Sequence, residues 1–580
     1  MHRNQFLAGL FLFFAGCSNS DVLPGSFATC ADIQSYVRIL SKPSSGAVPM
    51  SADASFSSSE TAANLQEAGV DEADPVRIGA HQIFVAHAGG VEVVERKTLR
   101  RLGSLSIGSL TDIRLFTDGD RLIFLGTTRS QLAPNRTKLE VRWYRLAAGL
   151  MPELIRSENH MGSLSDARYV NGFLVLVMDD SPIGYDGRVR FDDGGDTLSG
   201  VACDQVAYPA VRRLDFSFRK VVSLSESGKP RSVAFLGDAH TVYMTLESIY
   251  VASGWGGRLH LSKVSFDKES GMIQLAARGH VTGWIKDRWA FKEYPGGTLS
   301  VATTDGRANQ LHILREGRKV LKEVGASEVF GKTEDIRAIR YVGDIAYVVT
   351  FKKTDPLFAF DMKDPVHPKV LGELEIPGFS TYLHPISGGR MVGVGFDADD
   401  QGTFAWFQGI QISLFNIKDP EKLTRLDVKT LGVRGSYSDS TSDAHAFYFD
   451  PEHARIGVPI VELSGGSGLD STYGNTLAFS GAVIYGVGGG TLEEKVRLTH
   501  SDWIPEACKS LMRQGQWWSN SSRSYDINRL QNLDGDLVSI SRFGIRAHAM
   551  DNPLAESKSI RFDGGAEERG CQTSPYRYNW

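Results

Sequence analysis

The sequence lacks an excess of charge of either sign. Its 580 residues carry a formal net charge of -5, and 23% of them are charged. A basic excess would indicate a nucleic-acid partner, and a strongly acidic composition would indicate disorder. This balance favours an ordinary folded protein. We therefore expect no nucleic acid among its partners.

Long apolar runs are also lacking once the N-terminal residues are passed. The apolar run from Phe6 to Phe14 follows the basic His2 and Arg3, and the small residues Ala15 and Gly16 come after it. Such a run is too short to span a bilayer as a stable helix, but it has the pattern of a secretory signal. We predict a signal peptide over residues 1–16 and an exported protein.

The residues directly before Cys17 extend this prediction. The segment Phe14-Ala15-Gly16-Cys17 resembles the lipobox of bacterial lipoproteins, although Phe14 stands where that family prefers Leu. The resemblance implies that Cys17 becomes a lipidated N-terminus and that the membrane is contacted through this anchor only. The expected location is the bacterial envelope, at the outer membrane or in the periplasm of a double-membrane cell. Simple secretion is the alternative.

Cysteine is scarce, with 5 residues in the chain. Apart from Cys17 these are Cys30, Cys203, Cys508 and Cys571. An even number in an oxidising compartment predicts two disulfides, and three pairings are open. No two of these cysteines have the close spacing of a zinc site, so we predict no metal centre.

Recognisable catalytic motifs are missing. No Gly-x-Ser-x-Gly elbow accompanies His384 or His445, so neither indicates a Ser/His/Asp hydrolase. Residues 326–333 match a relaxed phosphate loop, but they lie between expected strands rather than between a strand and a helix. No Asp-x-Asp-x-Asp-Gly calcium loop occurs. The sequence therefore predicts no catalytic residue, no cofactor and no nucleotide partner.

One pattern recurs from residue 75 onward. Alternating apolar residues lead into a turn that contains Gly, Asp or Asn, and alternating apolar residues follow it. This is the pattern of a β-hairpin with one face buried. Eight such openings begin at Val76, Ile113, Ala167, Val233, Ile339, Tyr382, Phe447 and Leu533.

Two of these units end in the same tag. Asp361-Met362-Lys363-Asp364-Pro365 returns as Asn416-Ile417-Lys418-Asp419-Pro420, about 55 residues later. A repeat of this length with three or four antiparallel strands is a propeller blade. The predicted fold class is all-β, a single closed β-propeller with seven or eight blades of antiparallel strands.

The rest of the chain divides around this propeller. Residues 17–64 are rich in Ser, Ala and Pro and predict a flexible tether, which allows a short helix from Cys30 to Leu40. Residues 65–580 are the predicted propeller domain. Insertions are expected near 180–208 and 462–523, the second with a helix over Asp502 to Gln514.

Three stretches resemble a bacterial family of secreted proteins with a C-terminal β-propeller domain. They are residues 62–74 (AANLQEAGVDEAD), residues 283–304 and, most strongly, residues 339–385. Pro75 stands where an aliphatic residue is expected. The resemblance extends from about residue 60 to the end of the chain. It implies a propeller and export, and it implies no reaction.

The acidic cluster Asp71, Glu72 and Asp74 has two interpretations. These side chains either accept hydrogen bonds from backbone amides where the tether meets the first blade, or they form a cation or ligand site at the propeller mouth. Four further carboxylates are expected in a solvated loop, with calcium binding as the minority view. They are Asp186, Asp192, Asp193 and Asp196.

Propellers are rigid platforms whose loops bind other molecules. We therefore predict a binding or scaffolding module for a protein or polysaccharide in the cell envelope. The alternative is a hydrolase-like enzyme with its site at the mouth of the central channel, and a purely structural role is the third option. Carboxylates, His or Arg that converge on the axis would favour the enzyme.

Overall fold

A computed structural model of the chain describes most of the propeller and one segment before it. The described residues are 25–40, 64–87, 89–129, 136–183, 188–192, 195–209, 217–237, 241–351, 355–400, 405–465, 474, 476–503, 527–542, 544–550 and 552–562. Cys17, Cys508 and Cys571 lie outside them. Within these ranges α1 (Cys30–Leu40) is the one α-helix, and no helix has the length and apolarity of a membrane span.

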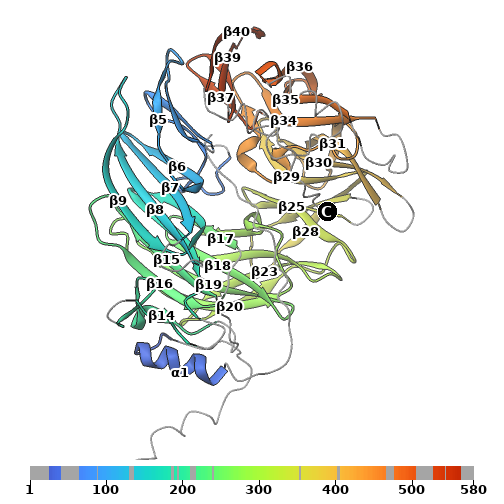
Figure 1. Ribbon diagram of the computed structural model, residues 1–580. Coiled ribbons are helices and arrows are strands. Elements are labelled where there is room, and N and C mark those ends of the chain that lie inside the picture. Colours follow the sequence, from blue (N-terminus) through green and yellow to red (C-terminus); the bar gives the residue numbers. More distant parts are fainter. Residues whose placement is uncertain are drawn as a thin grey trace, which may run out of the picture.

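Nine antiparallel four-stranded units form the body of the molecule (Figure 1). Blades 1 to 3 contain β2 (Val76–Ile78), β3 (Gln82–His87), β4 (Gly90–Glu95) and β5 (Arg101–Leu105); β6 (Thr111–Asp118), β7 (Arg121–Arg129), β8 (Thr137–Arg145) and β9 (Glu153–Met161); and β10 (Ser163–Val170), β11 (Phe173–Asp180), β15 (Phe218–Leu224) and β16 (Arg231–Leu236). Blades 4 to 6 contain β17 (Thr241–Met244), β18 (Ser248–Trp255), β19 (Arg258–Phe266) and β20 (Ile273–Thr282); β21 (Phe291–Tyr294), β22 (Thr298–Thr304), β23 (Asn309–Glu316) and β24 (Leu321–Ala326); and β25 (Asp335–Val342), β26 (Ile345–Phe351), β27 (Asp355–Asp361) and β28 (Lys369–Ile376). Blades 7 to 9 contain β29 (Phe379–Ile386), β30 (Arg390–Asp400), β31 (Ala405–Asn416) and β32 (Thr424–Leu431); β33 (Tyr448–Asp450), β34 (Arg455–Ser464), β35 (Thr476–Gly486) and β36 (Glu493–Leu498); and β37 (Arg529–Leu533), β38 (Asp536–Ser541), β39 (Gly544–Ala549) and β40 (Asn552–Arg561).

Apolar side chains between successive blades hold the ring together. Each of the nine interfaces between neighbouring blades has its own buried hydrophobic cluster. The cluster that closes the ring joins Val85 and Ile83 of blade 1 to Val538 and Ile545 of blade 9. The light-blue strands of blade 1 and the red strands of blade 9 accordingly lie side by side (Figure 1). The predicted closed β-propeller is confirmed.

The predicted count of seven or eight blades is wrong, because the ring has nine. The opening that was placed at Val233 is not a hairpin, since β16 is the last strand of blade 3 and β17 is the first strand of blade 4. Blade 5 produced no opening at all. Its first strand, β21, has only four residues, and Lys292 and Glu293 occupy the middle of it. Such a strand has no alternation of apolar residues for sequence reasoning to detect.

The two faces of the ring differ in their connections. Because the strands of each blade are consecutive and antiparallel, the turns after first and third strands share one face, which we call the turn face. The other connections share the opposite face, which we call the loop face. The longest connection on the turn face is seven residues, as at 146–152. The four longest connections, 181–217, 432–447, 465–475 and 499–528, all leave from the loop face.

The expected insertion at 462–523 is therefore two connections rather than one. Residues 476–498 inside that range form β35 and β36 of blade 8. The expected helix over Asp502 to Gln514 overlaps the described residues only in η5 (Ser501–Trp503), a single 3-10 turn. The insertion at 180–208 lies between β11 and β15 of blade 3.

Both repeated tags are turns between third and fourth strands. The blade 7 tag lies against the fourth strand of blade 6, where a Cβ on Gly372 would approach the carbonyl oxygen of Pro420 to 2.4 Å. A Cβ on Gly325 would likewise collide with the carbonyl of Val366, in the turn of blade 6. The glycines therefore let each turn pack directly on the backbone of the preceding blade.

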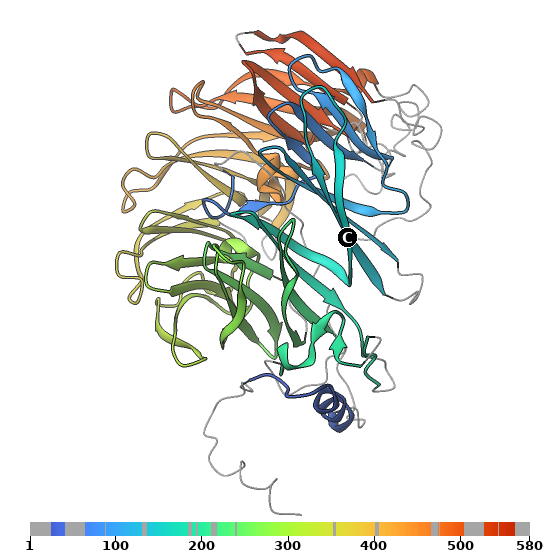
Figure 2. The same ribbon diagram turned by 90° about the vertical axis from the view of Figure 1, so that its left-hand side faces the viewer.

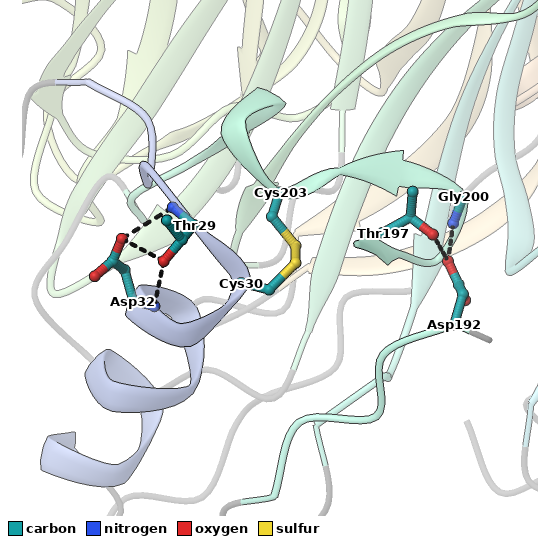
Figure 3. The surroundings of a disulfide bond; sticks show 7 residues. All are labelled: Thr29, Cys30, Asp32, Asp192, Thr197, Gly200 and Cys203. Atoms are coloured by element: carbon teal, nitrogen blue, oxygen red, sulfur yellow. Dashed lines mark hydrogen bonds between the residues drawn. A yellow bond between two sulfur atoms is a disulfide. The ribbon is translucent and has the colours of Figure 1, made fainter. Parts of the chain in front are cut away.

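Part of the expected tether is docked on the propeller. Ser26 forms a bridge with Ala207 of β14 (Val206–Ala207), which in turn pairs with β16, so these segments extend the outer edge of blade 3. Ile33 and Val37 of α1 are fully buried against this edge. A disulfide joins Cys30 to Cys203 of η1 (Cys203–Gln205), as Figure 3 shows. Residues 25–40 are thus part of the folded body.

Candidate functional site

Residues 64–75, which we call the axial segment, lie inside the ring. Within this segment β1 (Asp71–Glu72) pairs with Tyr169 and Arg168 of β10, on the side away from β11. Asp74 exchanges two backbone hydrogen bonds with Leu115 of β6. Both partners are first strands of their blades, and the fourth strands form the exposed rim. The axial segment is the blue piece between the blades in Figure 2.

Amide side chains carry the axial segment to the opposite side of the ring. The Asn64 Nδ2 donates to the carbonyls of Ala444, at 3.0 Å, and Phe447, at 2.6 Å, directly before β33 of blade 8. The Gln66 Nε2 donates to the carbonyl of Arg288 at 2.7 Å, directly before β21 of blade 5. The segment therefore contacts blades that are far apart around the ring.

Glu72 is a buried axial carboxylate that binds side chains from two blades. Its Oε2 accepts a hydrogen bond from the Arg288 Nη2 at 2.6 Å and lies 3.3 Å from the His445 Nε2. Glu72 is 1% exposed. Arg288 belongs to η2 (Arg288–Ala290) and His445 to η4 (Ala444–Ala446). One carboxylate thus connects the two short 3-10 helices that precede the first strands of blades 5 and 8.

Arg529 makes a second ion-pair centre, at the start of blade 9. Its Nε donates to the Asp74 Oδ2 at 3.1 Å, and its Nη2 donates to the Asp443 Oδ2 at 2.7 Å. The Asp74 side chain is fully buried and that of Arg529 is 5% exposed. Because Asp74 directly precedes blade 1 and Asp443 precedes blade 8, this arginine joins three neighbouring blades.

Two more carboxylates of the segment are paired in the same way. Asp71 lies 3.1 Å from the Nη2 of Arg77. Glu67 accepts from the Lys292 Nζ at 3.1 Å and from the Tyr243 hydroxyl at 2.8 Å. We call Glu67, Asp71, Glu72, Asp74, Asp443 and their cationic partners the axial clasp. The carboxylates of Asp71, Glu72 and Asp74 also accept hydrogen bonds from backbone amides, as in the first interpretation of the acidic cluster. Their guanidinium partners belong to the chain itself and were part of neither interpretation.

The clasp keeps its carboxylates ionised. Burial alone would raise the pKa of Glu72, but Arg288, Arg168 and His445 outweigh it and lower that pKa from 4.5 to about 2. Burial opposes ionisation of Asp443 as well, and Arg529 and His445 lower its pKa below the ordinary value. A carboxylate that stays ionised at every physiological pH is a poor general acid, and a paired one is a poor base.

The Glu72 pKa predicts acid sensitivity. Its folded-state pKa lies below its unfolded one, so its stabilising contribution is complete above about pH 4.5 and is lost as the pH falls toward 2. The difference corresponds to about 3 kcal/mol. We expect the urea midpoint of the wild type to fall steeply in this window and that of Glu72→Gln to fall less. Replacing Glu153, which is 74% exposed, by Gln should leave the dependence of the urea midpoint on pH as it is in the wild type. If the urea midpoints of all three proteins fell equally with pH, Glu72 would not be the source of the acid sensitivity.

His384 and His445 have separate surroundings. The Tyr382 hydroxyl and the His384 Nδ1 are 2.9 Å apart, and burial together with Arg340 lowers the pKa of His384 well below its usual value. The hydroxyl of Ser438 is bound to the carbonyl of Pro459 and not to a histidine. No Ser/His/Asp arrangement forms from these residues.

The carboxylates of the blade 3 insertion show no shared site in the described part of the chain. The Asp192 Oδ2 accepts from the Thr197 hydroxyl at 2.8 Å and from the Gly200 amide at 2.7 Å, which fixes the hairpin of β12 (Thr197–Leu198) and β13 (Val201–Ala202) (Figure 3). Asp186 and Asp193 lie outside the described residues. Among those described, no three His, Cys, Asp or Glu side chains are grouped to hold a metal ion.

The cationic half of the clasp was not predicted from the sequence. A usable signal was present, because four first strands have arginine between two apolar residues. These strands contain Arg77, Arg114, Arg168 and Arg340. A cation that recurs at the centre of inner strands, next to an acidic segment without a β pattern, is a signature of a charged axis. Arg288, Asp443 and Arg529 lie before or at the start of their strands and carry no comparable signal.

Comparison with known families agrees with the ring. The model of the family described as Beta propeller domain matches residues 58–553. The chain belongs to this β-propeller family. The matched range begins just before the axial segment and includes eight blades and most of the ninth.

Curated relatives of this β-propeller chain are uncharacterised. It is 40% identical over 188 residues to the uncharacterised protein MJ1554 of the archaeon Methanocaldococcus jannaschii, a match over 31% of this chain and 28% of that one. It is 37% identical over 206 residues to an uncharacterised protein of Archaeoglobus fulgidus, over 35% and 30% of the two chains. The matches thus span less than a third of these relatives, and they carry no activity to this chain.

Two solved structures show distant similarity. Kluyveromyces lactis Hsv2 is 12% identical, with a TM-score of 0.31 over 57% of this chain and 93% of that one. A Lactobacillus plantarum protein is 7% identical, with a TM-score of 0.32 over 59% and 92%.

Proposed function

We propose that this chain is an exported, lipid-anchored β-propeller that binds a protein or polysaccharide partner in the cell envelope through its loop face. The fold is that of a binding or scaffolding module. The signal-like N-terminus and Cys17 support export and anchoring. The difference between the two faces of the ring is the observation that carries the choice of surface.

The turn face is closed by short turns, whereas the four longest connections leave from the loop face. Long loops on a rigid scaffold are where propellers and related folds place their binding residues. Two half-exposed indoles also lie on this face. Trp255 and Trp284 are each 45% exposed, and their connections are joined by a hydrogen bond from the Gly283 amide to the Gly257 carbonyl at 2.8 Å. Exposed aromatic side chains are enriched in binding surfaces.

Carboxylates, His and Arg converge on the axis of the ring, and such a convergence would favour an enzyme. Their pairing argues for the binding module instead. Glu72, Asp74 and Asp443 each bind an arginine of the same chain, and lowered pKa values keep Glu72 and Asp443 charged. The clasp therefore acts as an internal tie, and the enzyme remains the second choice.

The double variant Trp255→Ala/Trp284→Ala is expected to reduce partner capture at least tenfold, because removing central aromatic contacts costs roughly 1–2 kcal/mol each. Immobilised chain is incubated with solubilised envelope proteins and, separately, with purified envelope polysaccharide, and the bound material is quantified. The control is Met272→Ala/Val320→Ala, which changes side chains that are 53% and 48% exposed on the turn face of the same two blades. Equal capture by both variants would contradict the proposed surface.

A further inference from the structure

Arg340 is a buried cation without a carboxylate partner among the described residues. It lies in the middle of β25, the first strand of blade 6, and is 8% exposed. Its guanidinium carbon lies 4.2 Å from the centre of the Trp289 indole ring. Its Nη1 is buried and has no hydrogen-bond partner. The cations of the axial clasp, by contrast, each have a carboxylate within ion-pair distance, as Arg77 has Asp71 and Arg529 has Asp443.

Arg288 presents a second free donor to the same region. Its Nη2 binds Glu72, but its Nη1 is buried without a partner. Its guanidinium carbon lies 5.4 Å from the centre of the Trp289 ring, and η2 packs against β25. The two arginines therefore share one indole, with unused N–H groups on each.

Within the described part of the chain, no other side chain around Arg340 supplies the missing negative charge. Burial raises the pKa of Tyr382 to about 12, so its hydroxyl stays protonated. His384, which is hydrogen-bonded to Tyr382, is neutral because burial and Arg340 lower its pKa. Glu72 and Glu67 act on Arg340 only through space, because Arg288 and Lys292 occupy them.

A buried guanidinium with open donors is unfavourable unless an anion completes it. We propose that a small monocarboxylate binds at the free Nη1 atoms of Arg340 and Arg288, against the Trp289 ring. A planar carboxylate matches the guanidinium fork, and its apolar end suits an indole wall. A single negative charge balances Arg340, whereas a phosphate dianion would be repelled by the ionised Glu72 nearby. This site is independent of the loop-face partner.

The test is the thermal unfolding midpoint of the full chain, measured against sodium acetate with total ionic strength held constant by sodium chloride. We expect a saturable rise of roughly 3 °C at a hundredfold excess over the dissociation constant. Equal concentrations of phosphate should give less than a third of this rise. Binding of ¹³C-acetate, followed by NMR line broadening, provides a readout that does not depend on unfolding.

Two substitutions at the site separate ligand binding from a structural role. Arg340→Met should unfold no earlier than the wild type without acetate, because a buried unpaired charge is removed, and it should show no acetate dependence. Arg340→Lys keeps the charge but loses the fork, and should weaken acetate binding at least tenfold. The control is Arg278→Met on β20, the outermost strand of blade 4. This buried arginine lies beside the Phe235 ring and donates to the Tyr208 carbonyl, and it also has two buried donors without a partner among the described residues, so it tests whether any such arginine would respond. This control should respond to acetate as the wild type does.

Several results would overturn the proposal. A wild type with no saturable acetate response would mean that water completes the two donors. An acetate response that survives in Arg340→Met, or that disappears in Arg278→Met, would place the anion elsewhere. A phosphate response as large as that of acetate, and dependent on Arg340, would refute the monocarboxylate.

Discussion

Replacing Arg529 by methionine is expected to destabilise the propeller by about 3–5 kcal/mol, because it strands two buried carboxylates. Asp74 and Asp443 both lie on this guanidinium, and both have side chains at most 15% exposed. Without the cation they must either stay charged in a medium of low polarity or take up protons. Urea unfolding of the full chain measures the loss as a shift of the midpoint with little change in slope.

Two comparisons make this expectation specific. Arg96 and Asp534 form another ion pair between blades 1 and 9, at 2.9 Å, but their side chains are 27% and 46% exposed. Arg96→Met should therefore cost less than about 1 kcal/mol. Adding Asp74→Asn and Asp443→Asn to Arg529→Met should restore part of the lost stability. If Arg96→Met and Arg529→Met proved equally harmful, the buried clasp would have no special role.

Removing the bond between Cys30 and Cys203 is expected to have an effect of similar size. The two cysteines are separated by 173 residues. Closing so long a loop in the unfolded chain is worth about 5 kcal/mol by loop entropy, and measured effects fall at or below this value. The bond also holds α1 against the edge of blade 3, so its loss should expose Ile33 and Val37.

The variant Cys30→Ser/Cys203→Ser is compared with the wild type with and without reductant. We expect both the variant and the reduced wild type to unfold at lower urea, and limited proteolysis to cut within α1 before it cuts the blades. Reductant should move the midpoint of the variant far less than that of the wild type. A wild type whose stability is indifferent to reductant would contradict this account.

The fold was predictable because its strongest signal is local. Hairpins such as Ile339 to Val349 alternate on either side of a two-residue turn, Gly343-Asp344, and this pattern needs no tertiary information. The two tags then established a repeat. The predicted number of blades was wrong for two reasons. The first strand of blade 5, β21, is short and polar, and at Val233 the apolar alternation runs from the last strand of blade 3 into the first strand of blade 4.

The axial clasp was only half predictable, for a different physical reason. Asp71, Glu72 and Asp74 stand out in the sequence, because three acids follow one another without a strand pattern. Their partners are 6, 216 and 455 residues away, and closure of the ring alone brings the distant ones near. A separation of that size leaves no trace in local periodicity.

Closure of the ring by apolar packing between blades 1 and 9 has a consequence for synthesis of the chain. Among the described residues, the face of blade 1 that holds Ile83 and Val85 is covered by residues 533–562, which are synthesised after the other eight blades. An open solenoid can bury each repeat on the one before it, but here the first sheet stays uncovered until blade 9 has been synthesised. A nascent chain of this protein should therefore depend on holding factors until blade 9 has emerged. The number of blades cannot change by one without reopening the ring.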